Sequence, residues 1–212
     1  MEIKKLPINL KVQEFPFPKT SNLTIRQQGD NSIRGEMNHQ FVITGGPGGG
    51  KTTILNALAE RGYRVVPETA RGIIKKRLAA GLSPRPDPVS FGQEILSSDI
   101  EKYRNSTLCK HAVFFDRGVL DALYMLDAVG ALTRDEIEQY VQQFPYNGIV
   151  FLLPPWKEIY VTDSERDQSF EESVTVFEDM KKWYLQWNYE TVEVPRGNIN
   201  ERILFILQFI AP

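Results

Sequence analysis

One short segment of the chain has the residue types and the spacing of a phosphate-binding loop. It fits the pattern G-x-x-x-x-G-K-[ST] at every fixed position. Glycines suit such a loop because the backbone must turn tightly while its N–H groups point at phosphate oxygens. We predict that residues 45–53, here called the phosphate loop, bind a nucleoside triphosphate. The residues are Gly45, Gly46, Pro47, Gly48, Gly49, Gly50, Lys51, Thr52 and Thr53.

Two side chains of the loop and one later carboxylate could handle the phosphates and a metal ion. Lys51 would reach the β- and γ-phosphates, and the Thr52 hydroxyl would hold Mg²⁺. Asp116 ends the apolar run HAVFF at residues 111–115, where a neighbouring strand would deliver it to the same ion. The alternative for Asp116 is a turn or helix-capping aspartate.

Two further charged residues follow predicted strands. Arg117 comes directly after Asp116, and its cation can stabilise phosphoryl charge or bind the phosphate of an acceptor. Glu68 follows the run VVP and could accept a proton from an attacking hydroxyl, an effect of about 10²–10⁴ in rate. The alternatives for Glu68 are a helix-start glutamate favoured by the helix dipole, or an ion pair with Arg71.

Two arginines in later segments could also reach a nucleotide. Residues 154–167 mix charges, aromatic residues and turn formers, and this segment could close over a triphosphate with Arg166 directed at the transferring group. The alternative is a solvated loop in which Asp163 pairs with Arg166. Arg196 follows the last predicted strand and could stack on a nucleotide base, although a plain loop explains it equally well.

Strands alternate with helices from residue 40 onward, a pattern that predicts βαβ units and a parallel sheet of about five strands. Several strand segments are apolar throughout, as a sheet covered by helices on both faces requires. Apolar residues at helical spacing along residues 170–187 predict a helix packed in the core. The predicted strands are 40–44, 63–66, 111–115, 148–153 and 191–194. The predicted helices are 51–61, 68–80, 89–104, 120–128, 170–187, 200–210 and one that Thr133 caps together with Glu136.

The composition of the chain argues against several classes of function. The chain has 212 residues and a formal net charge of −2, so a broad nucleic-acid footprint is not expected. Cys109 is the single cysteine, which excludes an intrachain disulfide, and with only His39 and His111 beside it a zinc site is not expected. No apolar run approaches the roughly 18 residues of a membrane span, and no secretory signal opens the chain. We expect a cytoplasmic protein.

Residues 1–39 differ from the remainder of the chain. They are polar and rich in turn formers, with a cluster at residues 29–32 between LTIRQQ and SIRGEM. We predict an N-terminal arm or a small hairpin at 1–39, followed by a single nucleotide-binding domain at 40–212. A lid over the domain's own surface, or a partner contact, is the alternative role of the arm.

Five sequence blocks, taken in order, resemble a known family. The chain is similar to the predicted ATPases of the AAA-domain group that is classed near ribosylnicotinamide kinases. The resemblance covers about residues 40–210 and implies the three-layer α/β fold of P-loop NTPases, of the nucleoside and nucleotide kinase type, with ATPase activity as the family name has it. The blocks are GGPGGGKTT, VVPETARG, FFDRG, PPWKEIYVTDSERDQSFEE and NYETVEVPRGNINERILFIL.

VVPE and the Asp-Arg pair are also similar to deoxynucleoside kinases. That resemblance implies Glu68 as the base, Asp116 as a metal ligand and Arg117 as a phosphate ligand. Deoxynucleoside kinases usually have a lid rich in arginine, whereas Arg166 is the only arginine between the fourth predicted strand and the long helix. The identity of an acceptor therefore does not carry over.

Three functions remain open on these residues. The first is a kinase that transfers phosphate from Mg-ATP to a small hydroxyl-bearing, nucleoside-like acceptor. The second is an ATPase or nucleotide-dependent switch, with ATP preferred over GTP because the chain lacks an NKxD tetrapeptide and has Val119 where a DxxG motif needs glycine. The third is a non-catalytic nucleotide-binding module, which the intact Lys51 and Thr52 argue against.

Overall fold

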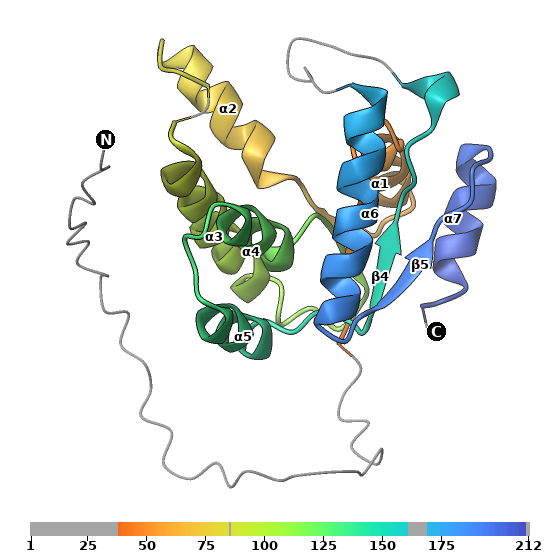
Figure 1. Cartoon of the computed structure of the whole chain (residues 1–212). Helices are drawn as coiled ribbons and strands as arrows, with labels where there is room; N and C mark the ends of the chain where they lie inside the picture. Colours follow the sequence, from red (N-terminus) through yellow and green to blue (C-terminus); the bar gives the residue numbers. More distant parts are fainter. Residues whose placement is uncertain (1–37, 85, 161–168, 211–212) are drawn as a thin grey trace, which may run out of the picture. The chain divides into compact units, whose positions relative to one another are not determined.

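The computed structural model describes residues 38–84, 86–160 and 169–210 of the chain (Figure 1). The arm or hairpin predicted at residues 1–39 lies outside the described residues except for Asn38 and His39. Residues 161–167 of the segment predicted to close over the triphosphate, Arg166 among them, also lie outside them, while residues 154–160 of that segment are described.

The sheet within the described residues has five strands, all parallel, in the order β2-β3-β1-β4-β5. This confirms the predicted sheet. β1 lies at its centre, and all five of its residues are buried. The strands are β1 (Gln40–Thr44), β2 (Arg64–Val66), β3 (Val113–Asp116), β4 (Ile149–Leu152) and β5 (Glu190–Glu193).

The helix predicted after Thr133 begins at its predicted cap. Thr133 accepts a hydrogen bond from the Glu136 N–H, and the Glu136 carboxylate accepts one from the Thr133 N–H, so the predicted capping box is confirmed. Similar boxes begin α6 and α7. The helices are α1 (Lys51–Glu60), α2 (Thr69–Ala79), α3 (Pro88–Arg104), α4 (Val119–Ala128), α5 (Arg134–Gln143), α6 (Phe170–Gln186) and α7 (Ile199–Leu207), with a short 3₁₀ turn η1 (Lys157–Ile159).

Helices cover both faces of the sheet, which gives the predicted three layers. Side chains alternate along a strand, so Phe41 and Ile43 of β1 pack into a cluster with α1 and α7. Val42 between them packs into a second cluster with α3, α4 and α6. Figure 1 shows α3, α4 and α5 grouped together. No helix of the described residues is both long and apolar enough to cross a membrane.

The parallel arrangement brings the predicted functional segments to one edge of the sheet. β1 leads into the phosphate loop, β2 into Glu68, and β3 ends at Asp116. Ile43 of β1 is in register with Asp116 of β3, so the acidic residue lies beside the start of the loop. Ligands of open parallel sheets bind beyond the carboxyl ends of the strands, and this edge is therefore where a site is expected.

Candidate functional site

A cavity of about 770 Å³ lies at the carboxyl edge of the sheet. The phosphate loop and the residues that follow β2 and β3 line one part of it, and side chains of α2, α3, α4 and α6 line the remainder. Most of the residues singled out in the sequence share this cavity. They are Pro47, Gly48, Gly49, Gly50, Lys51, Thr52, Thr53, Glu68, Asp116 and Arg117.

The phosphate loop depends on its glycines. Gly50, the N-cap of α1, has a φ of 79°, a conformation that residues with a side chain rarely adopt. A Cβ atom on Gly46 would lie 2.3 Å from the Ser173 carbonyl oxygen of α6, so only glycine fits there. The backbone of the loop is thus free to approach phosphate oxygens closely.

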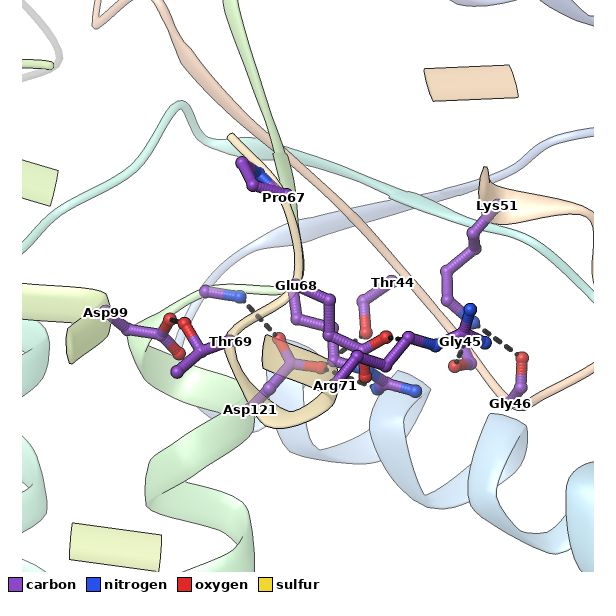
Figure 2. A network of polar contacts seen from close by, with 12 residues as sticks. Thr44, Gly45, Gly46, Lys51, Pro67, Glu68, Thr69, Arg71, Asp99 and Asp121 are labelled. Atoms are coloured by element: carbon purple, nitrogen blue, oxygen red, sulfur yellow. Dashed lines mark hydrogen bonds and ion pairs between the residues drawn. The ribbon is translucent and has the colours of Figure 1, made fainter. Parts of the chain in front are cut away.

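Lys51 is folded back onto this loop. Its Nζ donates hydrogen bonds to the carbonyl oxygens of Gly45 at 3.0 Å and Gly46 at 2.8 Å, as Figure 2 shows. Burial, together with the nearby Arg117 cation, lowers the pKa of Lys51 to about 7. The hydrogen bonds of this buried ammonium group go to neutral carbonyl oxygens, and a triphosphate would supply a negatively charged partner.

Glu68 and Arg117 form an ion pair inside the cavity. The Nε atom of Arg117 lies 3.2 Å from Oε1 of Glu68, and the Nε atom of Arg71 lies 3.2 Å from Oε2 (Figure 2). Burial raises the pKa of Glu68, but the positive charges of Arg117, Lys51 and Arg71 outweigh it and hold the pKa below its ordinary value. Glu68 is therefore an ionised carboxylate at neutral pH.

Asp121 of α4 holds Arg117 in place, a role that the sequence analysis did not identify. Its Oδ1 atom accepts hydrogen bonds from Arg117 Nη1 at 3.1 Å and from the Thr44 hydroxyl at 2.5 Å. Its Oδ2 atom accepts from the Gly118 N–H at 3.0 Å and from the Tyr184 hydroxyl at 2.7 Å. A glycine N-cap with an aspartate three residues later was the one available sequence signal.

Asp116 and Thr52 are suited to Mg²⁺. Oδ1 of Asp116 is buried and has no hydrogen-bond partner among the described residues, an arrangement that proteins rarely tolerate without a ligand. Burial and the neighbouring Glu68 charge raise the pKa of Asp116, so the carboxylate would gain from a cation. The Thr52 side chain lines the same cavity. Oxygen atoms of this kind are the ligands that Mg²⁺ prefers, together with substrate phosphates and water.

The part of the cavity away from the phosphate loop is largely apolar. Phe91 and Ile95 of α3, Tyr124 of α4 and Met180 of α6 contribute side chains to it. We call the space between these four residues the acceptor chamber. The Asp99 carboxylate, also from α3, lines the cavity as well.

Asp99 is buried beside Glu68. Its Oδ1 atom accepts a short hydrogen bond from the Thr69 hydroxyl, which in turn accepts one from Lys102 Nζ at 2.6 Å. Figure 2 shows Glu68 and Arg71 between Asp99 and Lys51. Burial raises the pKa of Asp99 from 3.8 to about 6. Sequence reasoning missed this residue because only the packing of α3 against α2 brings it to the cavity.

The raised pKa of Asp99 predicts a pH-dependent stability. The folded chain holds the Asp99 proton more tightly than the unfolded chain, so the free energy of unfolding falls as pH rises through about 4 to 6. For Asp99→Asn, which has no such proton, the unfolding free energy relative to wild type should rise by about 1 kcal/mol between pH 5 and pH 8. Urea unfolding at both pH values measures this, with Glu94→Gln on the exposed side of α3 as the control. An equal difference at both pH values would contradict it.

Two other arginines of the described residues, Arg196 and Arg202, differ in their position relative to the cavity. Arg196 is exposed, donates a hydrogen bond from Nη2 to the Pro155 carbonyl oxygen at 2.8 Å, and is not among the residues that line the cavity. Arg166 lies outside the described residues. Arg202 of α7, which the sequence analysis did not single out, lines the cavity beside the phosphate loop.

Comparison with known proteins identifies relatives of this fold. A family model described as an AAA domain matches residues 40–202. No curated protein matches the sequence.

Solved kinase structures share the fold of the described residues. Deoxyadenosine kinase from M. mycoides with bound dATP aligns with a TM-score of 0.56 at 14% identity, covering 80% of this chain and 97% of that one. Thymidylate kinase from Candida albicans aligns with a TM-score of 0.54 at 14% identity, covering 81% and 90%. The NadR protein in complex with NR aligns with a TM-score of 0.59 at 16% identity, covering 82% of this chain and 52% of that chain.

Proposed function

Since this chain belongs to the AAA-domain family and has the fold of P-loop kinases, we propose that it transfers the γ-phosphoryl group of Mg-ATP to a hydroxyl of a small, nucleoside-like acceptor. Deoxyadenosine kinase is named for a nucleoside, which is an acceptor of this chemical class, thymidylate kinase is named for a nucleotide, and NadR is described in complex with NR.

One observation carries the proposal: the cavity continues past Glu68 into the apolar acceptor chamber. A hydrolase needs room for one water molecule beyond the γ-phosphate, whereas four large side chains here line a further part of the cavity, away from the loop that would hold the phosphates. Walls of Phe91, Ile95, Tyr124 and Met180 suit a flat, largely apolar ring, and ligand pockets of this size typically combine such walls with a few polar groups. Asp99 supplies an acceptor for hydrogen bonds from the ring or its sugar.

The reaction follows from the charges around Glu68. The acceptor oxygen attacks the γ-phosphorus, the bond to the bridging oxygen of ADP breaks, and the acceptor proton passes to the Glu68 carboxylate. Lys51 and Arg117 supply positive charge to the phosphate oxygens as negative charge shifts toward ADP. Asp116 and Thr52 would hold Mg²⁺, which when bound neutralises charge on the phosphates. Asp121 keeps Arg117 directed at the site.

Consumption of ATP with and without a panel of nucleosides tests the proposal. We expect ADP to form at a rate that depends on the acceptor. ADP formation that is the same without any acceptor would overturn the kinase assignment in favour of an ATPase or a nucleotide-dependent switch. Binding of ATP with no turnover under any condition would also overturn it.

Filling the acceptor chamber should separate acceptor binding from ATP binding. Met125 of α4 lines the cavity and is 37% exposed, so its replacement does not open the core. The larger ring in Met125→Trp would enter the cavity, and we expect KM for the acceptor to rise about tenfold or more while the Kd of ATP stays unchanged. Steady-state kinetics and calorimetry measure the two values.

A matched control for the chamber variant is Leu185→Trp. Leu185 of α6 is 50% exposed and is not among the cavity-lining residues. This variant should behave like wild type in both measurements. If Met125→Trp leaves the acceptor KM unchanged, the acceptor does not occupy this chamber.

A further inference from the structure

Arg202 lies in α7, the last helix of the domain, and contacts the phosphate loop, which follows the first strand. It lies in the first turns of α7, only 4% of its surface is exposed, and it lines the cavity. Its Nη2 atom donates a hydrogen bond to the Gly49 carbonyl oxygen at 2.9 Å. Its guanidinium carbon lies 6.0 Å from the centre of the Trp156 ring. The side chain is therefore fixed against the loop.

The positive charge of Arg202 has no negative partner in the described part of the chain. No carboxylate there forms an ion pair with it. Among residues 38–84, 86–160 and 169–210, its Nε atom is buried without a hydrogen-bond partner, and the guanidinium hydrogen bond found there ends on a neutral carbonyl oxygen. A buried cation without a partner is costly, because removal from water is repaid only by opposite charge and hydrogen bonds.

The place of Arg202 indicates which anion would compensate it. Nη1 lies 2.9 Å from the point where a Cβ atom of Gly50 would stand, so the guanidinium group packs directly against the loop that receives phosphates. Arg117 and Arg71, by contrast, are both paired with Glu68 on the acceptor side of the cavity. Arg202 belongs to neither pair. Its guanidinium group is thus available to the phosphates of a bound nucleotide that lie away from the acceptor.

We propose that Arg202 is a nucleotide-binding residue whose guanidinium group contacts the α- or β-phosphate of the bound nucleotide. The inference rests on the proposed binding of a nucleoside triphosphate at residues 45–53. It adds to Lys51 a second cation, supplied by α7, that recognises the diphosphate portion shared by ATP and ADP. In a charge-assisted contact of this kind the guanidinium is a better donor than an ammonium group because its N–H groups form a planar fork.

The test compares adenosine, ADP and ATP on the full chain by calorimetry. Arg202→Gln should lower the affinities for ADP and ATP by the same factor, about tenfold, and leave adenosine binding unchanged. Arg202→Lys, which keeps the charge without the fork, should lie between Gln and wild type. Arg134→Gln is the matched control, because Arg134 is exposed, also lies over a tryptophan ring and is not among the cavity-lining residues; it should bind all three ligands like wild type.

Two results would overturn the role of Arg202. Unchanged ADP and ATP affinities in Arg202→Gln would show that no phosphate contacts it. Arg202→Gln could instead lose as much affinity for adenosine as for ADP and also melt at a lower temperature without nucleotide. This result would show that Arg202 only stabilises the structure of the loop. Failure of nucleotide binding at residues 45–53 is distinguishable from both, because the wild-type chain itself would then bind no ADP or ATP. Failure of the kinase assignment alone would appear in the turnover assay and would leave these affinities as expected.

Discussion

Glu68→Gln should bind ATP like wild type and lose about 10²–10⁴ in kcat for acceptor phosphorylation. The amide has nearly the same shape as the carboxylate, and its one oxygen can still accept a hydrogen bond from Arg117 or Arg71, while the other arginine loses its partner. It cannot take a proton at neutral pH. Because phosphoryl transfer passes through a loose transition state that needs little proton removal, the lower end of this range is expected.

The lowered pKa of Glu68 predicts the pH profile of the wild-type rate, and two variants separate a base from a structural residue. The positive charges around Glu68 hold its pKa below the ordinary value, so it stays ionised and should contribute no acidic limb to kcat near pH 7. Asp116→Asn provides the contrast, since its effect should appear in the dependence of the rate on Mg²⁺ concentration. If Glu68→Gln turns over like wild type while Asp116→Asn is inactive, Glu68 only starts a helix and pairs with arginine.

Lys51→Ala should keep the fold and lose about 100-fold in affinity for ATP. The ammonium group would contact the β- and γ-phosphates, and charged hydrogen bonds of this kind contribute about 1.5–3 kcal/mol each. The fold should survive because the partners of Lys51 without nucleotide are the two carbonyl oxygens of Gly45 and Gly46, and burial of its charge is itself unfavourable. Calorimetry and thermal unfolding measure the two properties.

The control for this variant is Lys182→Ala. The Lys182 side chain is 76% exposed on α6, and the nearest carboxylate oxygen in an ion pair with it, on Asp179, is 3.9 Å away. This variant should bind ATP normally. Unchanged ATP affinity in Lys51→Ala, with a melting temperature like that of wild type, would contradict the assignment of the phosphate loop.

The fold could be predicted because its signals are local or periodic. Glycines followed by Lys51 and Thr52 mark a loop between a strand and a helix, and apolar runs mark buried parallel strands. The family predicted from the sequence is confirmed by the match to the AAA-domain model. Parallel strands deliver their carboxyl ends to one edge, which is why Glu68 and Asp116 were expected to share a site and do line one cavity.

Contacts between distant side chains could not be predicted in the same way. The role of Asp121 depends on Thr44 of β1 and Tyr184 of α6, which packing brings to its carboxylate beside Arg117. Arg202 meets Gly49 only because α7 packs on the face of the sheet that α1 also covers. Both depend on packing angles and registers between helices, which local sequence patterns do not determine.

The acceptor chamber is the clearest case of this limit. Apolar spacing along residues 170–187 correctly predicts a helix packed in the core, and Met180 is only 2% exposed. The same side chain also lines the cavity opposite Phe91 and Tyr124, which come from other helices. Helical periodicity shows that a residue faces inward, and it does not show whether packed side chains or a ligand space lies on that side.

The fate of the γ-phosphoryl group tests the kinase assignment most directly. ATP labelled at the γ-phosphate is incubated with Mg²⁺, the wild-type chain and a panel of nucleosides, and the products are separated. If the chain is a kinase, the label appears in a phosphorylated acceptor, in an amount equal to the ADP formed, and Glu68→Gln loses this transfer. Label that appears only as inorganic phosphate, at a rate independent of every acceptor, would contradict it.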